Sequence, residues 1–137
     1  MASSGTTGNS ISLRSGLIRS GLPGVAPARD VPIRVAPVWL QRVWRGDVAA
    51  MTLPWVVYIA PDAIEAVSTG NAAELLAHEA VHVAQWQRLG TTRFLFRYGF
   101  EYLRGRAAGL PHAAAYRAIG LEREAVAEAV VATGRSA

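Results

Sequence analysis

Two of the three histidines in this 137-residue chain are four positions apart, and a glutamate directly follows the first of them. In an α-helix this spacing places His78 and His82 on one face, about one turn apart, where both imidazoles can bind one metal ion. Neutral imidazole is a preferred ligand of Zn²⁺. Glu79 lies about 100° further round the helix, so it is not an equivalent ligand but can accept a proton from zinc-bound water. The pattern therefore predicts a zinc-binding helix with Glu79 as its catalytic general base.

The residues around this motif predict a buried helix. Asn71 and Glu74 have the spacing of a capping box, and Gly90 suits the end of the helix. Between them apolar residues occur nearly all round the helix, which is typical of a central helix in a small core. Buried imidazoles are unfavourable unless they are satisfied. One metal ion would satisfy both, and hydrogen bonds to backbone carbonyls are the alternative.

A zinc site needs a third protein ligand, and residues 121–131 supply candidates on a second predicted helix. Glu122 and Glu124 lie about 200° apart on that helix, so only one of them can point at the metal. Glu122 lies on the apolar face. Glu124 shares its face with Glu128, a like-charged pair that is tolerated only in water. We therefore expect Glu122 to be the third ligand, with Glu124 and then His112 as alternatives.

The two motifs together resemble the gluzincin class of zinc metallopeptidases. The matching stretches are residues 75–90, LLAHEAVHVAQWQRLG, and 116–125, YRAIGLEREA. The short chain is similar to the minigluzincins and to small actinobacterial proteins in which HExxH is followed by ExEA. The resemblance implies a minimal zincin-like domain that hydrolyses peptide bonds, with Zn²⁺ held by His78, His82 and Glu122. Related membrane-embedded proteases have an aspartate that steadies a ligand histidine, and Val126 occupies that position here.

The same resemblance implies further site residues. Zinc peptidases place a Tyr or His donor against the carbonyl oxygen on which negative charge develops, and Tyr116 or His112 suits this role. They also bind extended substrate along the strand that precedes the active-site helix, here the strand from Trp55 to Ile59. An ordinary core strand is the alternative for that segment. The competing function is a catalytically inactive zincin-like module that binds zinc for interaction or regulation.

The remaining sequence predicts one mostly helical α+β domain, with three or four helices after a small sheet or ribbon. Residues 31–60 have β character, and residues 51–60 form the clearest strand. Residues 91–106 carry aromatic side chains at alternate positions, which is typical of a strand. Their length and the spacing of Arg97 and Glu101 nevertheless favour a helix.

Residues 1–30 are rich in Gly, Ser, Thr and Pro, so we expect a flexible basic arm ahead of a zincin-like domain over residues 31–137. The sequence has no basic cluster interleaved with aromatic residues, so nucleic acid is not an expected partner. It has neither the continuous apolar region of a secretory signal nor an apolar run that could span a bilayer, which favours a cytoplasmic location. The aromatic, arginine-flanked residues 91–106 are compatible with peripheral membrane contact.

Overall fold

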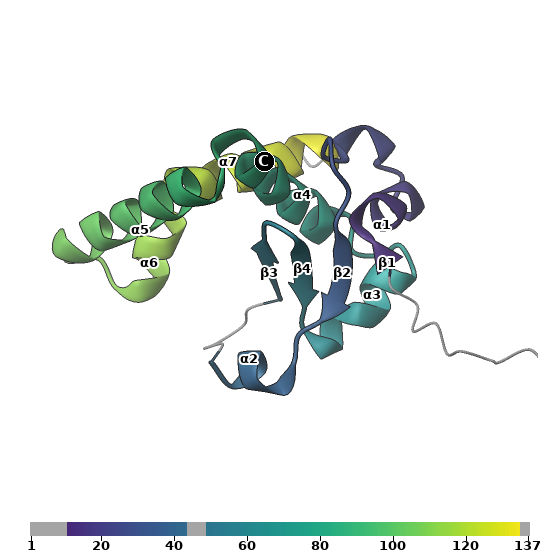
Figure 1. Cartoon of the computed structure of the whole chain (residues 1–137), viewed down its shortest axis with the longest axis horizontal. Coiled ribbons are helices and arrows are strands. Elements are labelled where there is room, and N and C mark those ends of the chain that lie inside the picture. The colour runs from purple at the N-terminus through teal and green to yellow at the C-terminus, as the bar shows by residue number, and fades with distance from the viewer. Residues whose placement is uncertain (1–10, 44–48, 135–137) are drawn as a thin grey trace, which may run out of the picture.

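The computed structural model describes residues 11–43 and 49–134, and its fold is α+β and mostly helical, as predicted (Figure 1). The sheet has the strand order β1–β2–β4–β3, in which β2 and β4 are parallel and the outer pairs are antiparallel. Its strands are β1 (Ile11–Ser12), β2 (Pro32–Val35), β3 (Ala50–Leu53) and β4 (Val56–Ile59). The helices are α1 (Leu13–Arg19), α2 (Val38–Val43), α3 (Ile64–Ser68), α4 (Ala73–Leu89), α5 (Thr91–Ala107), α6 (His112–Arg117) and α7 (Gly120–Ala132), with 3₁₀ turns at Pro23–Val25 and Pro61–Ala63.

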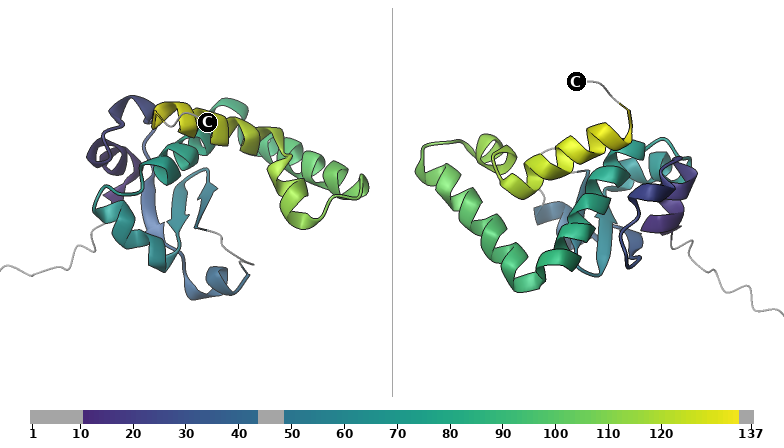
Figure 2. Two further views of the ribbon diagram at one scale, coloured as in Figure 1. Left: turned by 180° about the vertical axis from the view of Figure 1, so that it is seen from behind. Right: turned by 90° about the horizontal axis from the view of Figure 1, so that it is seen from above.

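The buried helix predicted around the HExxH motif is α4, and it lies at the centre of the molecule. It contacts β3 and the helices α1, α5 and α7 (Figure 2). Leu76, Ala80 and Val83 share one core cluster with Val57 and Ile59 of the sheet. These α4 positions recur at the spacing of one helical face, so α4 packs that face on the sheet.

The predicted end of α4 at Gly90 is confirmed, whereas the predicted capping box at its start is wrong. The helix ends at Gly90, whose φ of 78° is the left-handed conformation that glycine adopts without strain. At its start no side chain caps the helix. The Asn71 amide instead donates to the Thr69 hydroxyl, 3.1 Å away, so the predicted capping box does not form.

The strand predicted over residues 51–60 is a hairpin in the structure. A turn at Pro54 and Trp55 separates β3 from β4. Proline has no N–H to donate, so it suits a turn better than the middle of a strand. Because β4 lies between β2 and β3, both of its backbone edges are paired, so the prediction that extended substrate pairs with the strand from Trp55 to Ile59 is wrong. The outer strand of the described sheet on this side is β3.

The flexible arm predicted for residues 1–30 is wrong for residues 11–30, and residues 1–10 lie outside the described part of the chain. Leu13 and Leu17 are fully buried in the core cluster of α4 and the sheet. Gly16 lets α1 approach α4 closely, since a Cβ at this position would lie 3.2 Å from Cδ1 of Leu76. The folded domain therefore begins before residue 31.

The prediction of a helix over residues 91–106 is confirmed by α5. Together with α6 this helix extends beyond the sheet as an arm (Figures 1 and 2). Its inner face is anchored to the core by Phe94, whose ring stacks on Trp86 with 3.7 Å between centroids. Glu101 accepts a hydrogen bond of 2.7 Å from the backbone N–H of Gly120 at the start of α7. Within the described ranges, no helix combines the length and apolar character needed to cross a membrane.

Candidate metal centre

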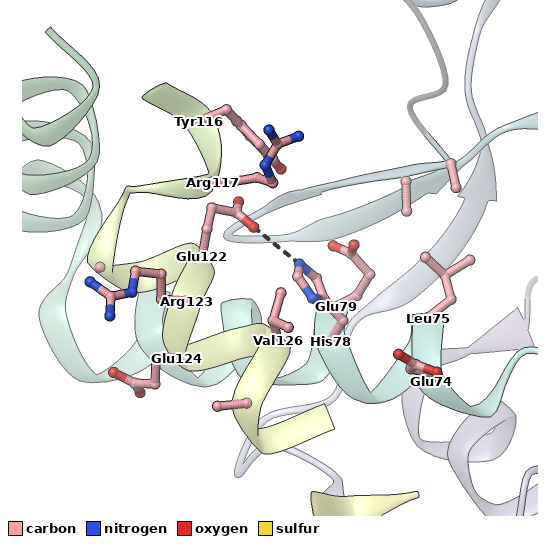
Figure 3. Close-up of a pocket in the computed structure, with 14 residues that line it drawn as sticks. Glu74, Leu75, His78, Glu79, Tyr116, Arg117, Glu122, Arg123, Glu124 and Val126 are labelled. Atoms are coloured by element: carbon pink, nitrogen blue, oxygen red, sulfur yellow. Dashed lines mark hydrogen bonds and ion pairs between the residues drawn. The ribbon is translucent and has the colours of Figure 1, made fainter. Parts of the chain in front are cut away.

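The packing of α4 against α7 brings His78, His82 and Glu122 together. Figure 3 shows the contact between His78 and Glu122. The Nε2 atoms of the two histidines are 3.1 Å apart. Oε2 of Glu122 lies 3.2 Å from Nε2 of His78, and Oε1 lies 3.1 Å from Nε2 of His82. Tetrahedral zinc with ligand bonds of about 2.0–2.1 Å separates its ligand atoms by about 3.3 Å. The spacing of the three side chains therefore suits a zinc ion with one coordination position left open.

The orientation of the His82 ring is fixed by Gln85, which is also buried on α4. A carbonyl only accepts hydrogen bonds, so the Gln85 amide nitrogen faces the Leu121 carbonyl, 3.0 Å away. The amide oxygen of Gln85 then faces Nδ1 of His82 at 2.9 Å, and Nδ1 must donate to it. In the neutral ring this leaves the lone pair of Nε2 directed at the other two ligand atoms, as metal binding requires.

The carboxylate of Glu122 is held in a second way, by α5. The Tyr98 hydroxyl donates a hydrogen bond of 2.8 Å to Oε1 of Glu122. Burial acts to raise the pKa of Glu122, but the hydrogen bonds with His78 and His82 outweigh burial and hold the pKa below its ordinary value. Glu122 is therefore a buried carboxylate that remains ionised and points at two imidazole nitrogens.

The other candidate ligands lie elsewhere. Glu124 is turned away from the centre and forms an ion pair of 3.5 Å with Arg88 (Figure 3). His112 is exposed at the start of α6, and its Nδ1 and the Tyr102 hydroxyl form a hydrogen bond of 2.8 Å. Glu124 and His112 are therefore absent from the one cluster of potential metal ligands found among the described residues.

Glu79 lies beside the ligand set but is not part of it. Its residue surface is only 5% exposed, and burial raises its pKa above the ordinary value. The hydroxyl of Thr52, on β3, donates a hydrogen bond to Oε2 of Glu79. Thr52 thus orients the carboxylate, and the raised pKa makes Glu79 a stronger base than an exposed glutamate.

Two cavities flank this centre. The larger, about 1080 Å³, lies over α4 and α7, and the smaller, about 370 Å³, is lined by β3 and α5. Four residues line both cavities: Ala50, Glu79, Tyr116 and Glu122. His112 lines only the smaller one. Partial burial, and then the charge of Glu122, raise the pKa of Tyr116, so its hydroxyl keeps its proton at neutral pH.

Three residues of the centre were missed by the reasoning from sequence: Thr52, Gln85 and Tyr98. Gln85 had a detectable signal, because it is a polar residue in an apolar helix and lies three positions after His82. Thr52 and Tyr98 are distant from the motif in sequence and reach the centre only through the packing of β3 and α5. No local pattern distinguishes either of them.

Comparison with protein-family models, curated proteins and solved structures finds no match for this chain. The class of protein can therefore be described only by the geometry of its fold and of its candidate site. That class is a small α+β domain in which two histidines and one glutamate, from two packed helices, converge beside a buried second glutamate.

Proposed function

We propose that this protein is a zinc-dependent metallopeptidase of the gluzincin type. The observation that carries the proposal is the convergence of His78, His82 and Glu122: the two Nε2 atoms lie 3.1 Å apart, and each lies 3.1–3.2 Å from a different oxygen of the Glu122 carboxylate. When both imidazoles are neutral and unprotonated on Nε2, as zinc ligands are, their lone pairs face the ionised carboxylate, and a cation between the three groups would bind all of them. His78, His82 and Glu122 would hold a zinc ion there, and the ion would supply an open coordination position for water, a lowered pKa of that water and polarisation of a carbonyl group.

Glu79 is the residue that would move the proton. It lines both cavities beside the three candidate ligands, where its carboxylate would face a water molecule bound at the centre. The carboxylate accepts a proton from the attacking water and then delivers it to the leaving amine. Thr52 holds Oε2 of Glu79, which leaves the other carboxylate oxygen for this transfer.

The polypeptide substrate would lie extended along β3. The four residues that line both cavities define a path from one cavity to the other past Glu79 and the ligands. On its outer side β3 has no strand partner among the described residues, although the Thr52 carbonyl accepts a hydrogen bond of 3.2 Å from the Trp86 indole, whereas β4 is paired on both sides. Tyr116 lies on the same path, where its hydroxyl can donate to the carbonyl oxygen as negative charge develops.

The ligand set is tested by metal analysis of purified protein. We expect stoichiometric zinc in the wild type, none in His82→Ala, and zinc binding weakened by about one to two orders of magnitude in Glu122→Ala. Glu124→Ala is the matched control, because it removes a glutamate from the same helix that points away from the centre. Full zinc occupancy in Glu122→Ala together with loss in Glu124→Ala would contradict the assignment.

The reaction is tested with Glu79→Gln on a mixed pool of unstructured peptides. The variant should keep its zinc and lose cleavage by several orders of magnitude, because the amide cannot accept the proton. Cleavage that survives the substitution would show that the activity belongs to a contaminant or to a different site.

A zinc-binding module without catalysis is the second candidate function. The burial of Glu79 favours it, since a carboxylate with 5% exposure also suits a structural role. In that case zinc-loaded wild type cleaves no member of the peptide pool, and Glu79→Gln changes only stability. The same pair of proteins therefore distinguishes the two functions.

A further inference from the structure

The outward face of α5 is apolar. Phe96, Phe100 and Leu103 are 73%, 56% and 66% exposed. Their spacing of four and three positions places them in one stripe along the helix. The rings of Phe96 and Phe100 stack with 6.1 Å between centroids, so two of the three phenylalanines of the chain form a paired surface that faces away from the core.

Arginines border this stripe. Arg93, Arg97 and Arg104 follow one side of it and Arg106 the other, and all four are exposed. The single acidic residue of α5, Glu101, lies on the inner side, where it accepts a hydrogen bond from Gly120. Glu101 lies 3.9 Å from Arg97 and so offsets little of the positive charge. The face is therefore an apolar stripe with a cationic border.

An apolar stripe bordered by arginines favours some binding partners over others. A second copy docked on the same face by two-fold symmetry would bring arginines against arginines, which is unfavourable. An anionic lipid surface meets both requirements, since the acyl boundary accepts Phe and Leu side chains and the phosphates accept guanidinium groups. Long arginine side chains can extend from the buried stripe to the phosphate level.

We propose that α5 binds the surface of membranes that contain anionic phospholipids. Phe96, Phe100 and Leu103 enter the boundary between headgroups and acyl chains, to a depth of about 5–10 Å, while the bordering arginines bind phosphates. The inner face of α5 stays packed, because Phe94 remains stacked on Trp86 and Tyr98 remains bonded to Glu122. Binding therefore needs no unfolding and requires neither zinc nor peptide hydrolysis.

The proposal is tested by co-sedimentation of the full chain with vesicles of phosphatidylcholine and phosphatidylglycerol in equal parts. Wild type should bind these vesicles at least about tenfold more tightly than vesicles of phosphatidylcholine alone, and added salt should weaken binding. The double variant Phe96→Ser with Phe100→Ser should lose at least about tenfold in affinity. Val131→Ser on α7 is the matched control, because Val131 is 80% exposed and lies outside the stripe.

A charge variant tests the arginine border separately. Arg93→Glu with Arg104→Glu should abolish the preference for phosphatidylglycerol, whereas Arg34→Glu on β2 should retain it. Circular dichroism and zinc content establish that each variant is folded.

Three results would overturn the proposal. The first is wild type that does not sediment with anionic vesicles, and the second is a serine double variant that binds as tightly as Val131→Ser. The third is a wild-type dimer in analytical ultracentrifugation that the serine substitutions dissociate, since that would make the stripe a contact between copies of the chain.

Discussion

At the scale of single residues, Gln85 decides which nitrogen of His82 is available to a metal. Its amide is fixed by the carbonyl of Leu121 on α7, so the tautomer of His82 depends on a contact between the two ligand-bearing helices. The sequence resemblance implies an aspartate that would steady a ligand histidine, and Val126 stands at the corresponding position. In this structure it is Gln85 that bonds the His82 ring.

Removing this support should weaken metal binding without removing a ligand. We expect Gln85→Leu to reduce zinc affinity by about 10-fold to 100-fold, because His82 loses the acceptor that fixes its tautomer and ring orientation. The measurement is competition with a zinc-binding dye. Gln87→Leu is the matched control, since the Gln87 side chain bonds the backbone of Arg29 and not the centre. Equal affinity in the two variants would argue that the ring of His82 is held by packing alone.

The residues found from sequence are those whose roles depend on position within one helix. His78, Glu79 and His82 follow from spacing along α4, and Glu122 follows from the apolar face of α7. Predicting each of these four residues required only the period of an α-helix. Tyr98 could not be found in this way, because its hydroxyl reaches Glu122 only through the angle at which α5 leaves α4.

At the scale of elements, the longer helices follow from patterns within their own sequence, whereas the short helix α1 and the order of the strands depend on tertiary packing. The helices α4, α5 and α7 were predicted because each has an internal pattern or clear ends. The seven residues of α1 carry no such pattern and sit in a Gly- and Ser-rich stretch, so their structure comes from burial of two leucines against α4. The order of strands in a sheet likewise depends on tertiary packing. The sequence therefore could not show that β3, and not the segment after Pro54, is the outer strand.

The burial of α1 can be measured by comparing two neighbouring positions. Leu17→Ala should lower the free energy of unfolding by about 2–5 kcal/mol, because it opens a cavity beside the core. Ile18→Ala should change it by less than about 1 kcal/mol, since Ile18 is 56% exposed. Urea unfolding followed by circular dichroism gives both values. Two similarly small losses would mean that α1 is not part of the cooperative core.

At the scale of the whole molecule, the candidate metal centre joins two helices that are separated by the α5–α6 arm. His78 and Glu122 are 44 positions apart in the chain. A ligand that binds only the folded chain stabilises it by mass action, so zinc bound to both helices should stabilise the whole domain.

Zinc should therefore raise the melting temperature of the wild type. At a free concentration about 100 times the dissociation constant we expect a gain of about 2.7 kcal/mol, which corresponds to a rise of about 10 °C for a domain of this size. Glu122→Ala should show a much smaller rise, and Mg²⁺ should have little effect because it prefers oxygen ligands. Calorimetry with and without a chelator makes the comparison. If a chelator leaves the melting temperature of the wild type unchanged, metal does not link the two helices.

The position of Tyr98 on α5 has a thermodynamic consequence. One face of this helix carries the bond to Glu122, and the opposite face carries Phe96 and Phe100. Linkage is reciprocal: if occupation of the outer face shifts α5 and changes the affinity of the centre for zinc, then zinc changes the affinity of the outer face for its partner by the same factor. Tyr98→Phe removes the hydroxyl that bonds Glu122 but keeps the zinc ligands and the apolar stripe. In this variant, zinc should therefore change the affinity of the outer face for its partner by a factor closer to one.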